Sequence, residues 1–321
     1  MYNYGKQTIE QDDIDAVVSV MKSDRLTQGP VVEYFEEALA EYVGAKYAVA
    51  FNSGSSALHA ALHGFNKLSK GVTTCNTFKA THNAIKGNGY ELKLLDINLN
   101  TYNAKYKESD DVIQVPVHFA GLPAKFEPGQ VVEDACHALG ARYEDGSMVG
   151  CCKDSMMTCF SFHPVKTITT GEGGAVTTNS QYDYEILKRN VNHGMGQNYR
   201  MTDIQAALGL SQLKKINRFL KRRREIFKIY NSEFKDIFKT PAYSDNSACH
   251  IYVGWFENKR VIAGRLLQAG IKCQEHYFND VDYFGLPNYE KYKLHNLTLP
   301  LYPGLTDKEI EYIIRAVKEC V

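Results

Sequence analysis

The stretch M-T-C-F-S-F-H-P-V-K-T-I-T-T-G-E-G-G-A-V-T-T-N, residues 157–179, places one lysine between two strand-like runs. Residues 157–162 and 174–179 are rich in threonine, valine and phenylalanine, which predicts two strands. The segment G-E-G-G at 171–174 indicates a tight turn, because it lacks the G-x-G-x-x-G spacing of a dinucleotide-binding loop. Lys166 therefore follows the end of a strand, in a segment that carries little other charge.

Further strand-like runs precede this stretch, and helical patterns at 55–68 and 78–86 separate the early ones. The runs lie at 48–51, 72–75, 92–97, 112–117 and 130–134. Strands that alternate with helices predict an α/β fold with a mostly parallel, seven-stranded sheet flanked by helices. Between Gly121 and Gln130 there is no room for a crossover helix, so one parallel connection must be built differently.

Helices are expected before this sheet, and a smaller α+β unit after it. Thr8 and Gln11 have capping-box spacing for a first helix, and its apolar stripe consists of Ile14, Val17, Val18 and Met21. A second helix begins near Pro30 and is expected to stop at Gly44.

A long helix is predicted over residues 202–235, followed by a strand at 250–256 and a helix at 260–270. We expect a large domain at 1–220 and a small C-terminal domain at 221–321. The apolar face of the long helix consists of Leu213, Ile216, Leu220, Phe227 and Tyr230. Its run R-F-L-K-R-R-R at 218–224 is expected to be a solvated face rather than a phosphate contact.

Composition excludes several classes of protein. The 321 residues contain 37 basic and 37 acidic side chains, without the basic excess of a nucleic-acid-binding domain. No apolar run is long enough to span a membrane, and the N-terminus does not resemble a signal peptide, so we expect a cytoplasmic protein. The eight cysteines form no C-x-x-C pair, which favours free thiols over disulfides or a metal site.

Polar residues gather where the predicted strands end, which is where open α/β sheets bind ligands. Ser53 to Ser56 lie at a strand-to-helix turn, where helix N–H groups and hydroxyls would hold a phosphate; simple N-capping by serine explains them equally well. Asp134 ends another strand, with His137 about one turn later. A carboxylate there could face a cation, or could simply cap a helix.

Ser161, His163 and Lys166 follow the strand at 157–162. A lysine in a low-dielectric site loses affinity for its proton and becomes available as a nucleophile or base. Together, a lysine, a carboxylate and a phosphate cradle suit pyridoxal phosphate: the lysine forms the Schiff base, and the carboxylate keeps the pyridine nitrogen protonated. A single lysine is more often an ordinary surface residue. The combination of lysine, carboxylate and phosphate-binding turn is what favours the cofactor.

The chain resembles the DegT/DnrJ-type sugar-nucleotide aminotransferases, a branch of the fold-type-I pyridoxal-phosphate enzymes, over nearly its whole length. The residues that carry the resemblance are Y-G-K-Q (4–7), L-T-Q-G-P (26–30), F-N-S-G-S-S-A-L-H (51–59), P-V-H-F-A-G (116–121), V-E-D-A-C-H-A-L-G (132–140), F-S-F-H-P-V-K-T-I-T-T-G-E-G-G-A (160–175) and N-Y-R-M-T-D-I-Q-A-A-L-G-L-S-Q-L (198–213).

The resemblance implies a role for each matching position. Lys166 would bind the cofactor and shuttle a proton to the sugar carbon, Asp134 would face the pyridine nitrogen, and Phe78 would stack on the ring. His137 would lie beside the oxygen substituent of the ring. The phosphate would be held by Ser55, Ser56 and Ser161, with Asn198 reaching in from the partner subunit of a homodimer. Positions near the sugar nucleotide would be Tyr4, Thr27, Gln28, Gly29, His163, His276 and Tyr277, although His276 and Tyr277 could simply pack at the domain junction.

The chain also departs from the family pattern in two places. A helix that relatives usually carry after H-F-A-G-L-P is replaced by A-K-F-E-P-G-Q, and the loop between H-G-M and N-Y-R is only G-Q (196–197). The second loop lies near the substrate entrance in the family. We therefore expect a more open and less selective site, with the cofactor residues intact.

The resemblance implies transfer of an amino group from glutamate to C4 of a UDP-linked 4-keto-6-deoxy-N-acetylhexosamine, as in the pseudaminic acid branch of the family. The substrate could instead be another nucleotide-linked 4-keto-6-deoxy sugar, of the perosamine or viosamine type. A sugar dehydratase on the same scaffold would carry histidine at the position of Lys166, which argues against that activity. A binding or regulatory homologue without turnover is the alternative from another class, and the intact Lys166, Asp134 and serine set argues against it.

Overall fold

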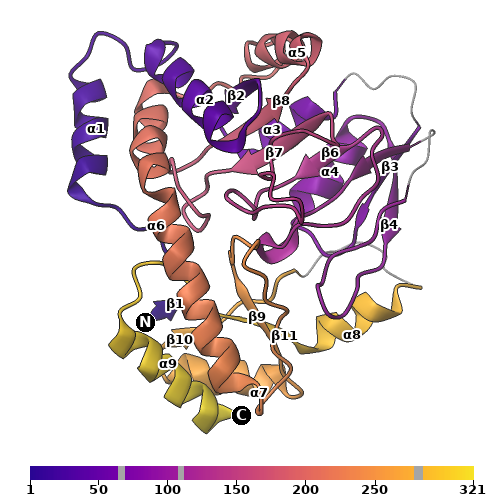
Figure 1. Ribbon diagram of the computed structural model, residues 1–321, viewed down its shortest axis with the longest axis vertical. Helices are drawn as coiled ribbons and strands as arrows, with labels where there is room; N and C mark the ends of the chain where they lie inside the picture. Colours follow the sequence, from indigo (N-terminus) through magenta and orange to yellow (C-terminus); the bar gives the residue numbers. More distant parts are fainter. Residues whose placement is uncertain (64–68, 108–111, 278–284) are drawn as a thin grey trace.

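The computed structural model describes residues 1–63, 69–107, 112–277 and 285–321. Its central feature is a sheet built from a four-stranded and a three-stranded ladder (Figure 1). In spatial order the strands are β2 (Tyr47–Phe51), β8 (Gly174–Thr178), β7 (Met157–Ser161) and β6 (Val132–Asp134), then β5 (Val112–Val115), β3 (Lys70–Thr74) and β4 (Glu91–Leu95).

Two parallel bridges, Gln114–Val131 and Val117–Asp134, join β5 to β6 and so connect the ladders. Within this set of strands β8 alone runs opposite to the other six. The expected mostly parallel, seven-stranded sheet is therefore confirmed. The segment between β5 and β6 contains one short 3-10 helix, η1 (Phe119–Gly121), and no crossover helix, as the short spacing predicted.

Helices cover both faces of the sheet, and the side chains of β2 show this because they alternate between two hydrophobic cores. Ala48 and Ala50 belong to a cluster with Phe35 of α2 (Pro30–Val43) and Leu220 of α6 (Asp203–Phe234). Val49 and Phe51 belong to the opposite cluster. The helices on that side are α3 (Gly54–Ala61), α4 (Lys79–Gly87) and α5 (Gln181–Val191).

The first two helices differ in how well the sequence predicted them. α2 begins at Pro30 and ends at Gly44, whose φ of 79° is the left-handed conformation expected of a C-terminal glycine. α1 (Gln11–Met21) is capped by Glu10 with Asp13, so the predicted capping box of Thr8 and Gln11 is wrong.

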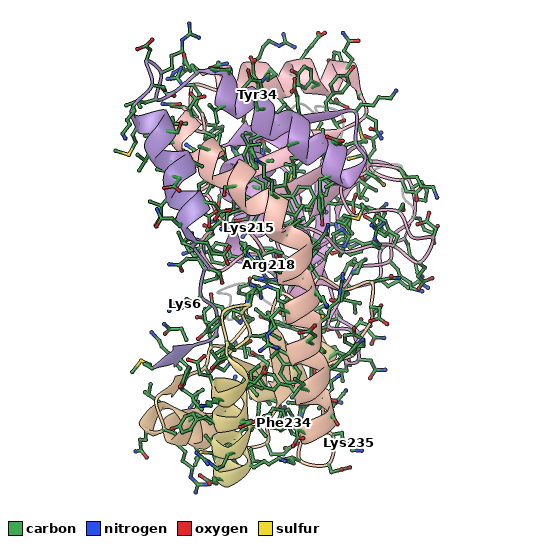
Figure 2. All side chains as sticks on the ribbon, turned by 60° about the vertical axis from the view of Figure 1, so that its left-hand side comes forward. Lys6, Tyr34, Lys215, Arg218, Phe234 and Lys235 are labelled. Carbon is green, nitrogen blue, oxygen red and sulfur yellow. The ribbon has the colours of Figure 1, made fainter. Side chains whose placement is uncertain are left out.

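The apolar stripe of α1 does not face the core. Ile14 is 46% and Met21 61% exposed, whereas Asp13 is fully buried. The reason is that α1 packs against α6 through polar pairs, in which Lys215 contacts Asp13 at 2.7 Å and Asp12 at 2.8 Å. Figure 2 shows Lys215 and Arg218 midway along α6, which runs nearly the length of the molecule.

Among its described residues, the C-terminal part contains a two-stranded antiparallel sheet and three helices, and the N-terminal strand pairs with it. Its elements are β9 (Tyr252–Trp255), α7 (Lys259–Gln268), β10 (Ile271–Lys272), α8 (Pro287–His295), β11 (Asn296–Leu299) and α9 (Asp307–Cys320). β1 (Tyr2–Asn3) pairs with β10, so the chain begins beside its last third. The predicted boundary at residue 220 falls inside α6, and the division into two domains stays a prediction.

The basic run at 218–224 is only partly the solvated face expected from its charge, because Arg218 and Lys221 are exposed and the other basic residues are not. Phe219, Leu220 and Arg223 are buried, with Arg223 only 1% exposed. Arg222 and Arg224 donate hydrogen bonds to the backbone carbonyls of Leu305 (2.9 Å) and Ser247 (2.9 Å). These side chains are placed by the junction between α6 and the C-terminal part, which helical periodicity alone does not reveal.

Three expectations came from composition: free cysteines, no metal site and no membrane span. All eight cysteines are free thiols. Among the described residues, no cluster of histidine, cysteine, aspartate and glutamate could hold a metal ion. In the same part of the chain, no helix has the length and apolar character needed to cross a membrane.

Candidate active site

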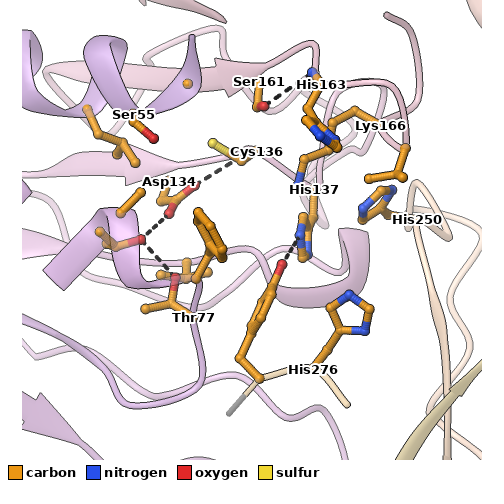
Figure 3. A pocket seen from close by; sticks show the side chains of 18 of the residues that line it. Ser55, Thr77, Asp134, Cys136, His137, Ser161, His163, Lys166, His250 and His276 are labelled. Carbon is orange, nitrogen blue, oxygen red and sulfur yellow. Dashed lines mark hydrogen bonds between the residues drawn. The ribbon is translucent and has the colours of Figure 1, made fainter. Parts of the chain in front are cut away.

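A cavity of about 360 Å³ opens where β2, β3, β6 and β7 end and where the C-terminal part meets the sheet (Figure 3). Ten of the residues expected at the site line it. They are Tyr4, Ser55, Phe78, Asp134, His137, Ser161, His163, Lys166, His276 and Tyr277. The carboxyl ends of strands far apart in the sequence thus meet at one place, as expected of an open α/β sheet.

Lys166 lies in the loop after β7, and its backbone N–H donates to the carbonyl of His163 at 2.8 Å. Burial lowers the pKa of its ammonium group, because a charge is less stable away from water. Cys136 and Asp134 act in the opposite direction and limit this decrease in pKa. A lysine in this setting provides a free amine more readily than a surface lysine does.

Asp134, the last residue of β6, is held as a hydrogen-bond acceptor. Its Oδ2 accepts from the hydroxyl of Thr81 at 2.6 Å, and its Oδ1 accepts from the backbone N–H of Cys136 at 3.1 Å. The side chain is only 5% exposed. These contacts fix the orientation of a carboxylate at the floor of the cavity.

His137 contacts Tyr277 in a defined arrangement. The Nδ1 atom of His137 accepts from the backbone N–H of Ala120 at 3.3 Å, and its Nε2 lies 2.7 Å from the Tyr277 hydroxyl. Burial, with Lys166 and His276 nearby, holds the pKa of His137 well below its usual range. A neutral ring that accepts at Nδ1 must carry its proton on Nε2, so His137 donates to Tyr277 and leaves the tyrosine O–H free to donate elsewhere.

The start of α3 forms a compact polar turn. Ser53 caps the helix by accepting from the backbone N–H of Ser56 at 3.1 Å, while Ser55 points its side chain into the cavity beside Ser161 (Figure 3). A Cβ on Gly54 would lie 2.7 Å from the Cβ of Ser161, and one on Gly174 would lie 2.4 Å from the carbonyl oxygen of Ser53. Both glycines are therefore required for the helix start to lie this close to β7 and β8.

Five expected residues do not line the cavity. The Ser56 hydroxyl donates to Asn52 Oδ1 at 2.6 Å. Asn198 lies outside, where its carbonyl accepts from Asn52 Nδ2 at 3.0 Å. Thr27, Gln28 and Gly29 lie at the start of α2: Thr27 forms a bridge with Thr202, Gln28 has a φ of 55°, and the Gly29 N–H donates to Asp203 Oδ2 at 2.7 Å.

Sequence reasoning missed six residues that bring a polar, titratable or thiol side chain to the cavity: Thr77, Thr81, Cys136, Glu172, His250 and Gln274. Thr77 and Thr81 follow β3, so the same strand-end argument could have found them. His250 had no local signal. Its ring is 2% exposed and packs 4.3 Å from the ring of His137, a contact between segments over a hundred residues apart in sequence.

The residues of the cavity fit pyridoxal phosphate, the cofactor expected from the sequence. The turn closed by Gly54 offers helix N–H groups and serine hydroxyls for a phosphate. Asp134 is an oriented acceptor for a protonated ring nitrogen, and Lys166 is a buried amine in the same cavity. Among the described lining residues, Lys166 is the only lysine, and no arginine is present.

Substituting Gly174→Ala should disturb the phosphate end of the cavity. The added Cβ would collide with the backbone of Ser53 and Gly54, so we expect pyridoxal phosphate affinity to fall at least about tenfold, with a loss of about 1–3 kcal/mol in stability from overpacking. Spectroscopic titration with the cofactor and thermal unfolding would measure both. Gly264→Ala is the control, because a Cβ there meets no atom within 4 Å. Unchanged cofactor affinity in Gly174→Ala would contradict the proposal that the turn at the start of α3 binds the phosphate.

Comparison with known proteins agrees with this site. Residues 7–318 match the DegT/DnrJ/EryC1/StrS aminotransferase family. A Campylobacter jejuni protein named UDP-4-amino-4,6-dideoxy-N-acetyl-beta-L-altrosamine transaminase is 33% identical, over 98% of this chain and 96% of the relative. The structure of Helicobacter pylori PseC, an aminotransferase of pseudaminic acid biosynthesis, superposes with a TM-score of 0.90 at 29% identity, over 99% and 98% of the two chains. The sugar aminotransferase Spr1654 of Streptococcus pneumoniae, in its PMP form, superposes with a TM-score of 0.87 at 25% identity, over 99% and 96%. The chain belongs to the DegT/DnrJ/EryC1/StrS aminotransferase family.

Proposed function

We propose that this protein uses pyridoxal phosphate to transfer an amino group from glutamate to C4 of a UDP-linked 4-keto-6-deoxy-N-acetylhexosamine. The observation that carries the proposal is that Lys166, Asp134, Ser55 at the start of α3 and Ser161 at the end of β7 all line one cavity. The substrate follows from the named Campylobacter jejuni relative and from the superposition on PseC. When bound, the cofactor supplies the electron withdrawal that amino transfer needs.

The residues of this chain have separate tasks in that reaction. Lys166 is the covalent attachment point and, as a free amine, moves the proton at the substrate carbon. Asp134, fixed by Thr81, keeps the ring nitrogen protonated. Ser55 and Ser161 bind the phosphate together with the N-terminus of α3, and Ser56 supports that turn from behind.

Phe78 and the His137–Tyr277 pair orient the ring. Phe78 is 51% exposed at the start of α4, and its ring lies 5.9 Å from that of Tyr277, so it can cover one face of the cofactor. The Tyr277 hydroxyl, which accepts from His137, can donate to the oxygen substituent of the ring. A neutral donor there stabilises a negative oxygen without adding a competing charge.

The sugar nucleotide would enter from the side lined by Tyr4, His163, His276 and Tyr277. Burial lowers the pKa of His276 to about 3, and its Nδ1 lies 2.8 Å from the hydroxyl of Thr298. His276 therefore contacts the substrate as a neutral side chain. A bridge between Asn192 and Asn198 closes the short segment that contains the two-residue G-Q connection. We propose that this shortening leaves the substrate entrance more open and the enzyme less selective among keto sugars.

We further propose a cytoplasmic homodimer in which Asn198 and Thr27 to Gly29 serve the cavity of the partner. Asn198 and these residues all lie outside the cavity of their own chain. The exposed apolar stripe of Ile14, Val18 and Met21 on α1 is suited to burial against a second copy.

An absorbance experiment tests the function directly. Glutamate should convert the spectrum of the bound aldehyde form of the cofactor to that of the amine form, and a UDP-4-keto-6-deoxy-N-acetylhexosamine should reverse the change, because both half-reactions use Lys166. Lys166→Ala should show neither conversion at a comparable rate. Conversion by glutamate without reversal by this sugar would leave an aminotransferase with a different acceptor, and no change with glutamate would refute the proposal.

Mixing two variants tests the shared site. Lys166→Ala and Asn198→Ala should each lose most activity, while their mixture should recover up to about a quarter of wild-type activity, since half of randomly mixed dimers carry one complete site. The measurement is amino transfer after the two proteins are unfolded and refolded together. No recovery, with each variant folded, would argue against a site completed by the partner.

The rate of cofactor capture should depend on pH through Lys166. Because burial favours the neutral amine, the proton leaves Lys166 at a pH below its ordinary pKa of 10.5. The rate at which cofactor-free protein captures pyridoxal phosphate should therefore rise with pH and level off before pH 10.5. Stopped-flow absorbance would measure this rate, and a midpoint at or above 10.5 would contradict the assigned environment of Lys166.

A further inference from the structure

Arg223 is a buried cation on α6 whose hydrogen bonds all lead to the active-site cavity. Its side chain is 1% exposed, and its Nη1 atom donates to the carbonyl oxygens of His250 at 2.9 Å and Leu301 at 3.0 Å. The Nη2 atom approaches the carbonyl oxygen of Lys166 at 3.5 Å. No ion pair within the described residues includes Arg223.

The three carbonyl acceptors are connected to three walls of the cavity. Lys166 and His250 line it themselves. Leu301 binds the backbone carbonyl of Tyr4, another lining residue, through its N–H at 3.0 Å. One guanidinium group therefore contacts the lysine loop that follows β7, the segment before β9 and the segment after β11.

The chemistry of arginine suits this position. A planar guanidinium can donate several hydrogen bonds in fixed directions, and a lysine ammonium cannot reproduce that geometry. Burial lowers the pKa of Arg223 to about 10, so the group still carries its charge at neutral pH. A buried charge without a carboxylate partner costs several kcal/mol unless polar groups solvate it. The carbonyls solvate Nη1 and Nη2, whereas Nε has no hydrogen-bond partner among the described residues. The positions of the carbonyls and of the cation therefore depend on each other.

The contact continues into the cavity through His250. Its backbone N–H donates to the carbonyl of Ala120 at 2.9 Å, and the N–H of Ala120 donates to Nδ1 of His137 at 3.3 Å. The rings of His250 and His137 pack with their centroids 4.3 Å apart. A fixed backbone at His250 thus also restrains the ring of His137, which donates a hydrogen bond to the Tyr277 hydroxyl.

We propose that Arg223 is a positioning residue that holds the Lys166 loop in register with the His250–His137 wall of the cavity. The proposal rests on the proposed role of Lys166 as the cofactor-binding lysine. Arg223 touches neither substrate nor cofactor in this assignment. It acts through the carbonyl oxygens of Lys166, His250 and Leu301, and so couples the C-terminal part of the chain to the reacting amine.

Arg223→Lys tests the geometry while keeping the charge. We expect the rate of the glutamate half-reaction to fall about 10- to 100-fold, the size of effect produced by misplacing a reacting group, while pyridoxal phosphate affinity changes less than about threefold because Asp134 and the serine turn are untouched. The pH midpoint for labelling of Lys166 in cofactor-free protein, followed by mass spectrometry, should also shift upward because a looser loop admits water.

Arg222→Lys and Arg224→Lys are matched controls on the same turn of helix. Arg222 binds the carbonyl of Leu305 and the carboxylate of Asp307, and Arg224 binds the carbonyls of Ser247 and Gly140, so neither reaches Lys166. Both control variants should keep the labelling midpoint and the half-reaction rate of the wild type.

The outcomes separate this inference from the proposed function. If wild-type protein fails to react with glutamate, the proposed function is wrong. If the wild type reacts and folded Arg223→Lys matches the controls, the positioning role is wrong. Arg223→Gln keeps an amide donor for one carbonyl and repeats the test without the charge. If both Arg223 variants fail to fold while both controls fold, Arg223 is a stability residue and the inference is overturned.

Discussion

Burial shifts the pKa values of several titratable groups that line the cavity. Burial lowers the pKa of Lys166, and it lowers the pKa values of His137 and His250 well below the ordinary range of histidine. It also raises the pKa of Tyr277 well above its usual value. At neutral pH the site consequently offers neutral imidazoles and an intact phenol, together with an amine that loses its proton more readily than a surface lysine does. Asp134 is held differently, because two hydrogen-bond donors contact its carboxyl oxygens.

Such a cavity requires contributions from both parts of the chain. The sheet supplies the strand ends that carry Asp134 and Lys166, whereas His250 and His276 come from the C-terminal part. α6 joins the two parts physically: it packs on α2 near its start and reaches α9 near its end. Apolar residues of α6 belong to the core against the sheet and, further along the helix, to the core of the C-terminal part. The three arginines at 222–224 add hydrogen bonds at the junction. By holding the two parts together, the helix brings side chains from distant segments into the same cavity.

The sequence was most informative where local chemistry decides the structure. The strand pattern, Gly44 at the end of α2 and the missing crossover helix before β6 follow from turn chemistry and spacing, and the structure has all of them. Lys166 and Asp134 were identified because strand ends in this fold class meet at one edge. The resemblance to the family supplied Phe78, Tyr4 and His276, which no local pattern distinguishes from packing residues.

The failures share a physical cause, which is that helical periodicity does not say what lies opposite a helix. The buried residues of α1 are Asp13 and Val20, neither of which belongs to the apolar stripe found in the sequence. Asp13 is buried because α6 presents Lys215 and Gln212 to it. The basic run at 218–224 was expected to face solvent, yet Arg223 is buried and donates to backbone carbonyls of the Lys166 loop and of the C-terminal part, which are distant from it in sequence. His250 was missed for the same reason, since its partner His137 lies on the other part of the chain. In each case a charge or polar group is stabilised by contacts between segments distant in sequence, and such contacts also bring the C-terminal wall of the cavity to Lys166.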